Sequence, residues 1–165
     1  MQFKELKATE IDNNLISMIK DEWMLISAGD EKNHNMMTAS WGFSGEMWGK
    51  DCFIAAVRPT RHTHKFLEEN DTFALAFLGK GHPSHKICGA LSGRDIDKVK
   101  ETGLTPIYSD GAMYFKEARL VVILKKIYTQ DIKPECFLDK SLDEKWYNDD
   151  YHTLFFGEVI KVLTK

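Results

Sequence analysis

The stretch Arg119-Leu-Val-Val-Ile-Leu-Lys125 indicates the fold most directly, because an unbroken apolar run lies between two charged residues. A short run of this kind, rich in β-branched residues, is typical of a buried strand. Thr72-Phe-Ala-Leu-Ala-Phe-Leu78 is a second such run, and Gly79 and Gly81 stop it. The sequence therefore predicts a protein built on buried β-strands.

Three further apolar runs predict additional strands, at residues 23–27, 52–57 and 154–163. Gly157 lies within the last of them and predicts a bulge or the close approach of another backbone. The polar residues 28–35 predict a hairpin connection. Residues 37–48 are small and aromatic, and they match neither a regular helix nor a clean strand.

Short helices are predicted between the strands, at residues 60–70, 83–91 and 95–101. Thr60 can cap the first, Pro83 can begin the second, and Gly103 stops the third. Residues 134–138 predict an irregular or short helical connection. Because strands and helices do not alternate regularly, a doubly wound parallel sheet is disfavoured. The pattern predicts a mainly β fold, a small antiparallel barrel with a few short helices.

Length and charge restrict the class of protein. The chain has 165 residues and a mass of 19.0 kDa, which predicts a single domain spanning residues 1–165. Lys and Arg number 22 against 25 Asp and Glu, and the net charge of -3 gives no global attraction to nucleic acid. No run approaches the roughly 20 apolar residues of a membrane span. We therefore expect no nucleic-acid partner and no membrane contact.

Cysteine and aromatic content add two expectations. The cysteines are Cys52, Cys88 and Cys136, an odd number without a CxxC spacing, which favours a reducing compartment. The N-terminus has no signal-peptide core, so the predicted location is cytoplasmic. Aromatic residues make up 12% of the chain, which suits a well-filled core or a stacking surface for a planar ligand.

Two weak motifs favour ordinary structure. Residues 79–84 resemble GxGxxG but carry Ser84 at the third glycine and lack a βαβ context, so a plain turn is the better interpretation. His82, His85 and Cys88 could share one helix face, yet no HExxH or CxxC partner accompanies them. We therefore predict no metal site, and we expect Cys52 to be buried and inert.

Arg58-Pro-Thr-Arg-His-Thr63 is the best candidate for an anion site, because it combines two guanidinium groups with a predicted strand-to-helix junction. A helix N-terminus offers unpaired N–H groups, and the forked donors of Arg fit phosphate oxygens. The alternative interpretation is a solvated turn. From this segment alone, both remain open.

Two other segments could contact a ligand. The small residues of Asn35-Met-Met-Thr-Ala-Ser-Trp-Gly42 would let a ligand approach the backbone, although a strand packed in the core explains them equally. Ser92-Gly-Arg-Asp-Ile-Asp-Lys98 could lie beside the polar edge of a ligand. The alternative is that Asp95 caps a helix while Arg94 and Lys98 are solvated.

Taken together, these segments resemble the flavin reductase-like family of FMN-binding split barrels, which includes flavoredoxin-like proteins. The resemblance extends from about Trp23 to Leu163 and rests on the order and spacing of several motifs. The motifs are residues 23–27, 35–42, 47–49, 58–63, 92–98, 103–106, 117–120, 151–152 and 157–158.

The resemblance implies a Greek-key split β-barrel that forms a homodimer, with FMN at each subunit interface. The residues it implies for FMN binding are Met37, Thr38, Ala39, Ser40, Trp41, Arg58, Arg61, His62, Thr63, Ser92, Gly93, Lys98 and, near the flavin, His152. Residues 37–41 would line the isoalloxazine, and residues 58–63 would hold the phosphate. Lys98 is a candidate for stabilising the reduced flavin near N1 and O2, and Trp41 and Trp48 are expected beside the flavin slot.

The implied function is an oxidoreductase that transfers a hydride from NADH or NADPH to flavin, with no protein residue acting as a general acid or base. The alternative is a flavoredoxin-like electron carrier that keeps its FMN and passes electrons to a redox partner protein. A third alternative is a ligand-binding barrel without enzymatic activity. The redox chemistry in the first two belongs to the flavin, and the protein positions and tunes it.

Overall fold

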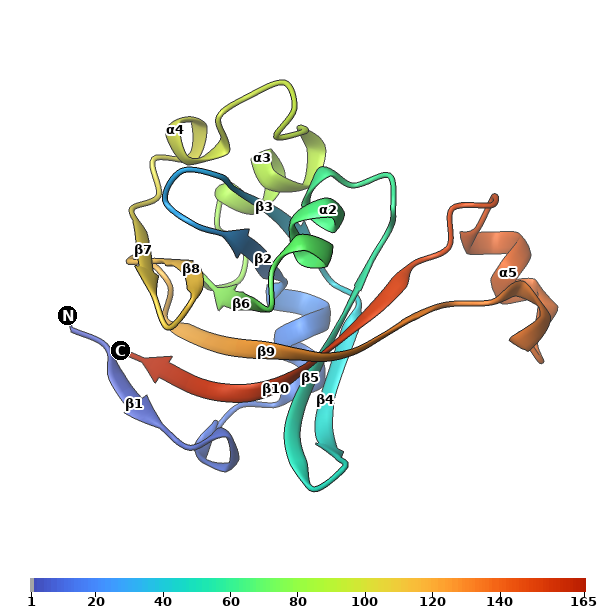
Figure 1. The fold of residues 1–165 in the computed structure, drawn as a ribbon, viewed down its shortest axis with the longest axis horizontal. Coiled ribbons are helices and arrows are strands. Elements are labelled where there is room, and N and C mark those ends of the chain that lie inside the picture. The colour runs from blue at the N-terminus through green and yellow to red at the C-terminus, as the bar shows by residue number, and fades with distance from the viewer. Residues whose placement is uncertain (1) are drawn as a thin grey trace.

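A computed structural model describes residues 2–165, and Figure 1 shows a curved antiparallel sheet with short helices around it. The strands lie across the sheet in the order β3-β2-β6-β9-β10-β5-β4, and β1 pairs with β10. Their bounds are β1 Lys4–Leu6, β2 Met24–Gly29, β3 His34–Ala39, β4 Gly42–Met47, β5 Lys50–Val57, β6 Thr72–Phe77, β9 Leu120–Asp131 and β10 Thr153–Thr164. A separate hairpin joins β7 Pro106–Ser109 to β8 Ala112–Phe115. The predicted mainly β, antiparallel fold is confirmed.

The helices are short and lie between strands, as predicted, although their ends differ. They are α1 Leu15–Ser17, α2 His62–Glu69, α3 Ser84–Ala90, α4 Lys98–Thr102 and α5 Lys140–Trp146, with single turns at η1 Ala8–Glu10, η2 Met18–Glu22 and η3 Pro134–Cys136. Arg61, not Thr60, is the N-cap residue of α2. The helix expected at 95–101 begins only at Lys98, because the Asp97 side chain accepts from the backbone N–H of Lys100 and so caps it.

The central strands carry long apolar runs where both faces of the sheet are buried. Ile26, Leu75 and Val122 face one cluster inside the barrel. Their neighbours Leu25 and Val121 face a second cluster, which also contains residues of the β7–β8 hairpin. Side chains of a strand alternate between faces, so a strand covered on both sides needs apolar residues at every position. The apolar run at 72–78 forms β6, and the run at 119–125 forms the first half of the neighbouring strand β9.

Gly157 occupies the irregularity that the sequence predicts. The register between β9 and β10 shifts between Phe156 and Gly157. A Cβ at Gly157 would lie 2.6 Å from the Cβ of Leu124 and 3.0 Å from Phe73. The predicted bulge is confirmed, whereas the atoms that approach Gly157 belong to the side chains of Leu124 and Phe73 and not to another backbone.

Residues 37–48 correct the prediction of an irregular segment. They contain the end of β3 and all of β4, which pair with β2 and β5 respectively. β4 and β5 are joined by Trp48 and Gly49, both with positive φ, of 58° and 72°. A two-residue hairpin of this kind normally carries Asn-Gly or Asp-Gly, so Trp48-Gly49 does not stand out as a turn in the sequence.

The barrel opens between the two ends of the sheet. β3 and β4 are consecutive in the chain, and where they join, the backbone N–H of Ala56 donates to Trp41 O at 3.2 Å. Residues 132–152, which we call the arm, leave the barrel between β9 and β10 and carry α5 (Figure 1). This opening and the base of the arm enclose the candidate site.

Within residues 2–165, no helix is both long enough and apolar enough to cross a membrane.

Candidate functional site

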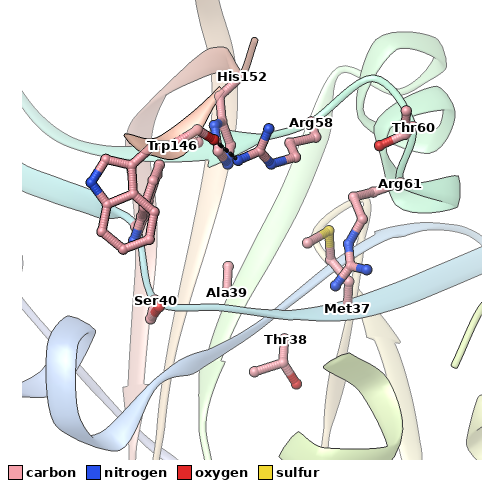
Figure 2. A pocket seen from close by; sticks show the side chains of 11 residues that line it. Met37, Thr38, Ala39, Ser40, Arg58, Thr60, Arg61, Trp146 and His152 are labelled. Atoms are coloured by element: carbon pink, nitrogen blue, oxygen red, sulfur yellow. Dashed lines mark hydrogen bonds between the residues drawn. The ribbon is translucent and has the colours of Figure 1, made fainter. Parts of the chain in front are cut away.

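A groove of about 370 Å³ lies where the barrel opens, between the end of β3, the end of β5 and the arm. Figure 2 shows the side chains that line it, which come from four separate segments of the chain. They are Met37, Thr38, Ala39, Ser40, Trp41, Ala56, Arg58, Thr60, Arg61, Trp146 and His152. The volume falls in the range of small-molecule sites, and the lining is a mixture of apolar, aromatic and cationic groups.

The floor of the groove is the free edge of β3. The carbonyl of Met36 accepts from Lys98 Nζ at 2.9 Å, so it points away from the paired strand β2. Main-chain groups of an antiparallel strand alternate in direction, so those of Thr38 point to the same free edge. The small side chains of Ala39 and Ala56 leave room above this backbone. A flat ligand with a polar edge could therefore approach main-chain donors and acceptors directly.

The side-chain hydroxyl of Thr38 does not point toward the groove as its main-chain groups do. It donates to the carbonyl of His85 in α3 at 2.8 Å. Figure 2 shows this side chain turned away from Arg58 and His152. The hydroxyl therefore fastens β3 to α3.

One wall of the groove is aromatic. The rings of Trp41 and His152 lie with centroids 4.7 Å apart and planes tilted by 35°. Trp146, from the arm, meets Trp41 edge-on at 5.1 Å. The Tyr147 hydroxyl shares a hydrogen bond with His152 Nδ1 at 3.0 Å. Trp41 and His152, whose planes are the least tilted, form a surface against which a planar ligand could lie, and Trp146 and Tyr147 support it from the side.

His152 is uncharged at neutral pH. Burial lowers its pKa from 6.5 to about 4, and the positive charge of Arg58 acts in the same direction. Burial raises the pKa of the Tyr147 phenol, which therefore keeps its proton as well. The aromatic wall is thus neutral, and the charge of the groove lies elsewhere.

The cationic end of the groove holds Arg61, whereas Arg58 lies beside the aromatic wall, where it contacts the arm. Arg58 donates from Nη1 to Asp150 O at 2.6 Å and from Nη2 to Trp146 O at 2.8 Å, and its guanidinium lies over the Tyr147 ring. Arg61 donates from Nη2 to Gly89 O at 2.8 Å. Arg61 is also the N-cap residue of α2, whose eight residues present a helix N-terminus at this end. A helix N-terminus and a guanidinium together favour an anion.

The structure brings one group of predicted residues into the groove and places another behind it. Those lining the groove are Met37, Thr38, Ala39, Ser40, Trp41, Arg58, Arg61 and His152. His62, Thr63, Ser92, Gly93 and Lys98 do not line it. Physical contacts explain each of these exceptions.

Thr63 and Gly93 both pack against Asn35 at the start of β3. Asn35 Nδ2 donates to Thr63 Oγ1 at 3.0 Å. A Cβ at Gly93 would lie 2.1 Å from Asn35 Oδ1, so only glycine fits there. Ser92 is half-buried beside Gly93, and its hydroxyl accepts from the backbone N–H of Arg94 at 3.2 Å. His62 begins α2 with Nδ1 buried and without a partner, and burial lowers its pKa.

Lys98 corrects the expectations drawn from its segment, because it is neither solvated nor inside the groove. Its side chain is buried, and Nζ donates to the carbonyls of Met36 and Cys88 at 2.9 and 3.0 Å. Burial lowers its pKa, although the amine retains its two acceptors. Lys98 therefore joins β3 to α3 from behind the groove. Asp95 likewise does not cap α4, since Asp97 does.

Two lining residues were not expected from the sequence, namely Ala56 and Trp146, while Thr60 lies within the predicted anion segment 58–63 but was not singled out. Ala56 precedes Arg58 by two positions, so its proximity to that segment was the available signal. Trp146 lies in the arm, where no motif marks it. Trp48 lies outside the groove of its own chain, with its ring 5.6 Å from that of Tyr128.

The histidines and cysteines elsewhere form no metal centre. Within the described part of the chain, residues 2–165, no three His, Cys, Asp or Glu side chains gather as metal ligands would. Cys88 is buried, and burial raises its pKa to about 11. Cys52 is also buried with a raised pKa, as expected for an inert thiol.

Comparison with known proteins gives a family and a fold. The family model described as "Flavin reductase like domain" matches residues 17–165. No curated protein matches the chain.

Three solved structures are similar across most of the chain. Flavoredoxin from Methanosarcina acetivorans has a TM-score of 0.70 at 19% identity, over 97% of this chain and 76% of that one. An FMN-binding domain of a flavin reductases-like enzyme from Shewanella baltica has a TM-score of 0.68 at 16% identity, over 99% and 77%. The NADH:FAD oxidoreductase of Streptomyces globisporus, in complex with NAD and FAD fragments, has a TM-score of 0.62 at 18% identity, over 86% and 73%. The likeness confirms the predicted split-barrel fold.

Proposed function

Because the chain belongs to the flavin reductase-like family, we propose that it is an oxidoreductase that transfers a hydride from NADH or NADPH to FMN bound in the groove. The observation that carries this proposal is the groove itself. It combines an exposed main-chain edge, a neutral aromatic wall and a cationic end within one cavity. These are the three surfaces that a flat, polar-edged ring with a phosphate tail requires.

The residues present fit FMN by their chemistry. Arg61 and the N-terminus of α2 would hold the phosphate at the cationic end. The main chain of residues 38–40 would contact the polar edge of the ring, and Trp41 and His152 would lie beside its flat part. The chemistry supplied by bound FMN is acceptance of a hydride from a nicotinamide.

The protein's own residues then orient and shield the ring. Ala39 and Ala56 admit it close to the backbone, and Trp146 from the arm excludes water on one side. His152 brings no charge to the ring at neutral pH, since burial lowers its pKa to about 4. No residue of the groove is required to move a proton.

We also propose that the protein acts as a homodimer. Large aromatic side chains are exposed on β4 and on the turn that follows it, where Phe43 and Trp48 are exposed by 52% and 57%. Phe43 shares a smaller hollow with Ser40, a residue of the groove floor. Aromatic residues of this exposure are typical of subunit interfaces.

Light scattering after size-exclusion chromatography tests the homodimer. We expect a mass of twice 19.0 kDa for the native chain and a shift toward the single-chain mass in Phe43→Asp. A single-chain mass for the native protein at micromolar concentration would contradict the homodimer.

A flavin-binding and reduction experiment tests the proposed activity. The purified protein is mixed with FMN, desalted and examined for the flavin absorption band, and NADH or NADPH is then added without oxygen. We expect retained FMN whose band bleaches faster than that of free FMN at the same nucleotide concentration. Retained FMN that neither nucleotide bleaches faster than free FMN would contradict the hydride transfer and favour the electron carrier. Protein that retains no FMN would overturn both.

A further inference from the structure

The two arginines of the groove have unequal surroundings. The Arg58 guanidinium is directed toward His152 and Trp146, whereas Arg61 extends across the groove toward Met37 (Figure 2). Both arginines lie just after β5, three positions apart, so the sequence alone does not distinguish their roles. Their contacts show that they serve different purposes.

Arg58 is occupied by the arm. Its two terminal nitrogens donate to the carbonyls of Trp146 and Asp150, at 2.8 and 2.6 Å, and its Cζ atom lies 5.0 Å from the centre of the Tyr147 ring. Hydrogen bonds from a charged donor are among the stronger ones in proteins. Arg58 thus holds three residues of the arm, Trp146, Tyr147 and Asp150, at the end of β5.

The surroundings of Arg58 also disfavour a phosphate there. The carboxylate of Asp150 lies 3.6 Å from Arg58 Nη1, and it accepts from Thr60 Oγ1 at 2.9 Å. A dianion placed at Arg58 would meet this carboxylate and would have to displace two backbone acceptors. Each change costs binding free energy, because like charges repel and the freed carbonyls would lose their donors.

Arg61 is free of such competition. Its one protein acceptor is the carbonyl of Gly89, and among residues 2–165 no carboxylate forms an ion pair with it. A guanidinium has five N–H donors, so most of those of Arg61 remain available. The N-terminus of α2, of which Arg61 is the N-cap residue, adds partial positive charge at the same place.

We propose that Arg58 is a positioning residue that holds the arm, and with it the Trp146 wall of the groove, while Arg61 alone of the two binds the phosphate of FMN. The second half of this inference rests on the proposed function. The first half concerns the chain without a ligand and stands independently of it.

The arm contact is tested on the ligand-free protein by limited trypsin digestion. Lys140 and Lys145 lie in α5, and cleavage there requires the arm to open locally. We expect Arg58→Ala to accelerate cleavage at these lysines by about tenfold or more, while Arg61→Ala leaves it unchanged. Lys32, in the exposed turn between β2 and β3, is the internal reference, and its cleavage should not change in either variant.

The phosphate assignment is tested by the dissociation constants of FMN and riboflavin, which differ only in the phosphate. Arg61→Ala should weaken FMN by about tenfold or more and leave riboflavin within about twofold. Arg58→Ala should weaken both flavins by a similar factor, because it loosens the wall that contacts the ring. If Arg58→Ala folds poorly, Arg58→Lys takes its place in both experiments. Lysine keeps the positive charge but lacks the forked donors of arginine, so we expect it to loosen the arm in the same way.

The outcomes separate the two halves. Unchanged cleavage at Lys140 and Lys145 in both Arg58 variants overturns the arm contact. A selective loss of FMN over riboflavin in the Arg58 variants, with none in Arg61→Ala, overturns the phosphate assignment. If the native chain binds neither flavin, the proposed function and the phosphate assignment both fail, and the digestion still decides the arm contact.

Discussion

The closed side of the barrel and its open side use their residues in opposite ways. On the closed side, β9 and β10 are twelve residues each and pair along almost their whole length, with Phe155 and Leu124 fully buried between them. On the open side, β3 has one paired edge, and its other edge faces α3 and the groove. Stability and binding therefore depend on different residues, which makes them separable by mutation.

The largest effect is expected from removing a ring on the closed side. Phe155→Ala deletes a fully buried side chain and should lower the free energy of unfolding by about 3–5 kcal/mol. Leu138→Ala in the arm is the control, because Leu138 is fully exposed and should change stability by less than about 0.5 kcal/mol. Urea unfolding measures the free energy of unfolding of both variants. Similar losses in the two would contradict the view that the buried residues of the closed side determine stability.

The bulge offers a second contrast, between two glycines in neighbouring parts of the sheet. Gly157→Ala places a Cβ 2.6 Å from the Cβ of Leu124, and the forced shift should cost about 1–3 kcal/mol of unfolding free energy. Gly45→Ala in β4 meets nothing within 4 Å and should be close to neutral. Equal stability of the two variants would show that Leu124 and Phe73 can move to admit a Cβ at position 157, which would contradict the expected clash.

Acid should weaken the open side through His152. The folded-state pKa of about 4 lies below the ordinary 6.5, so the unfolded chain binds the proton first. This contribution is complete above about pH 7.5 and is lost as the pH falls through 6.5 toward 4, by about 2 kcal/mol between about pH 7.5 and 5.

Urea unfolding of native protein and His152→Gln at both pH values measures this loss. The variant should lack about 2 kcal/mol of the native pH dependence. A slope remains from His62 and His85, whose pKa values burial also lowers. Identical pH dependence in the two proteins would contradict the buried, neutral state of His152.

The smallest effect is expected at Thr38, whose hydroxyl donates to His85 O. Thr38→Val should cost about 1 kcal/mol of unfolding free energy and leave FMN affinity nearly unchanged. Thr38→Ser, which keeps the hydroxyl, is the control and should retain most of that stability. A tenfold loss of FMN affinity in Thr38→Val with unchanged stability would show that the hydroxyl faces the flavin instead.

The sequence predicted the closed side better than the open side, for a physical reason. Runs such as 73–78 and 120–124 are apolar at every position because both faces of the sheet are buried there, and that pattern is local. β4 and the turn at Trp48 and Gly49 depend on pairing with β5, which no local pattern reveals.

The site shows the same limit. The segments at 35–42 and 58–63 were found because their residue types are unusual together, and they do meet in the groove. Lys98 and Arg58 could not be assigned, because the sequence records a positive charge but not which carbonyls surround it. Trp146 reaches the groove only through the path of the arm, and nothing near it in the sequence indicates that path.

The central claim is that flavin binds in the groove at the opening of the barrel. The chain has four tryptophans, and their indole N–H signals in a two-dimensional NMR spectrum can be assigned with single Trp→Phe variants. During titration with FMN, we expect the signals of Trp41 and Trp146 to shift together and to saturate at one FMN per chain. Saturation with FMN while both signals stay in place would put the flavin elsewhere and contradict the account.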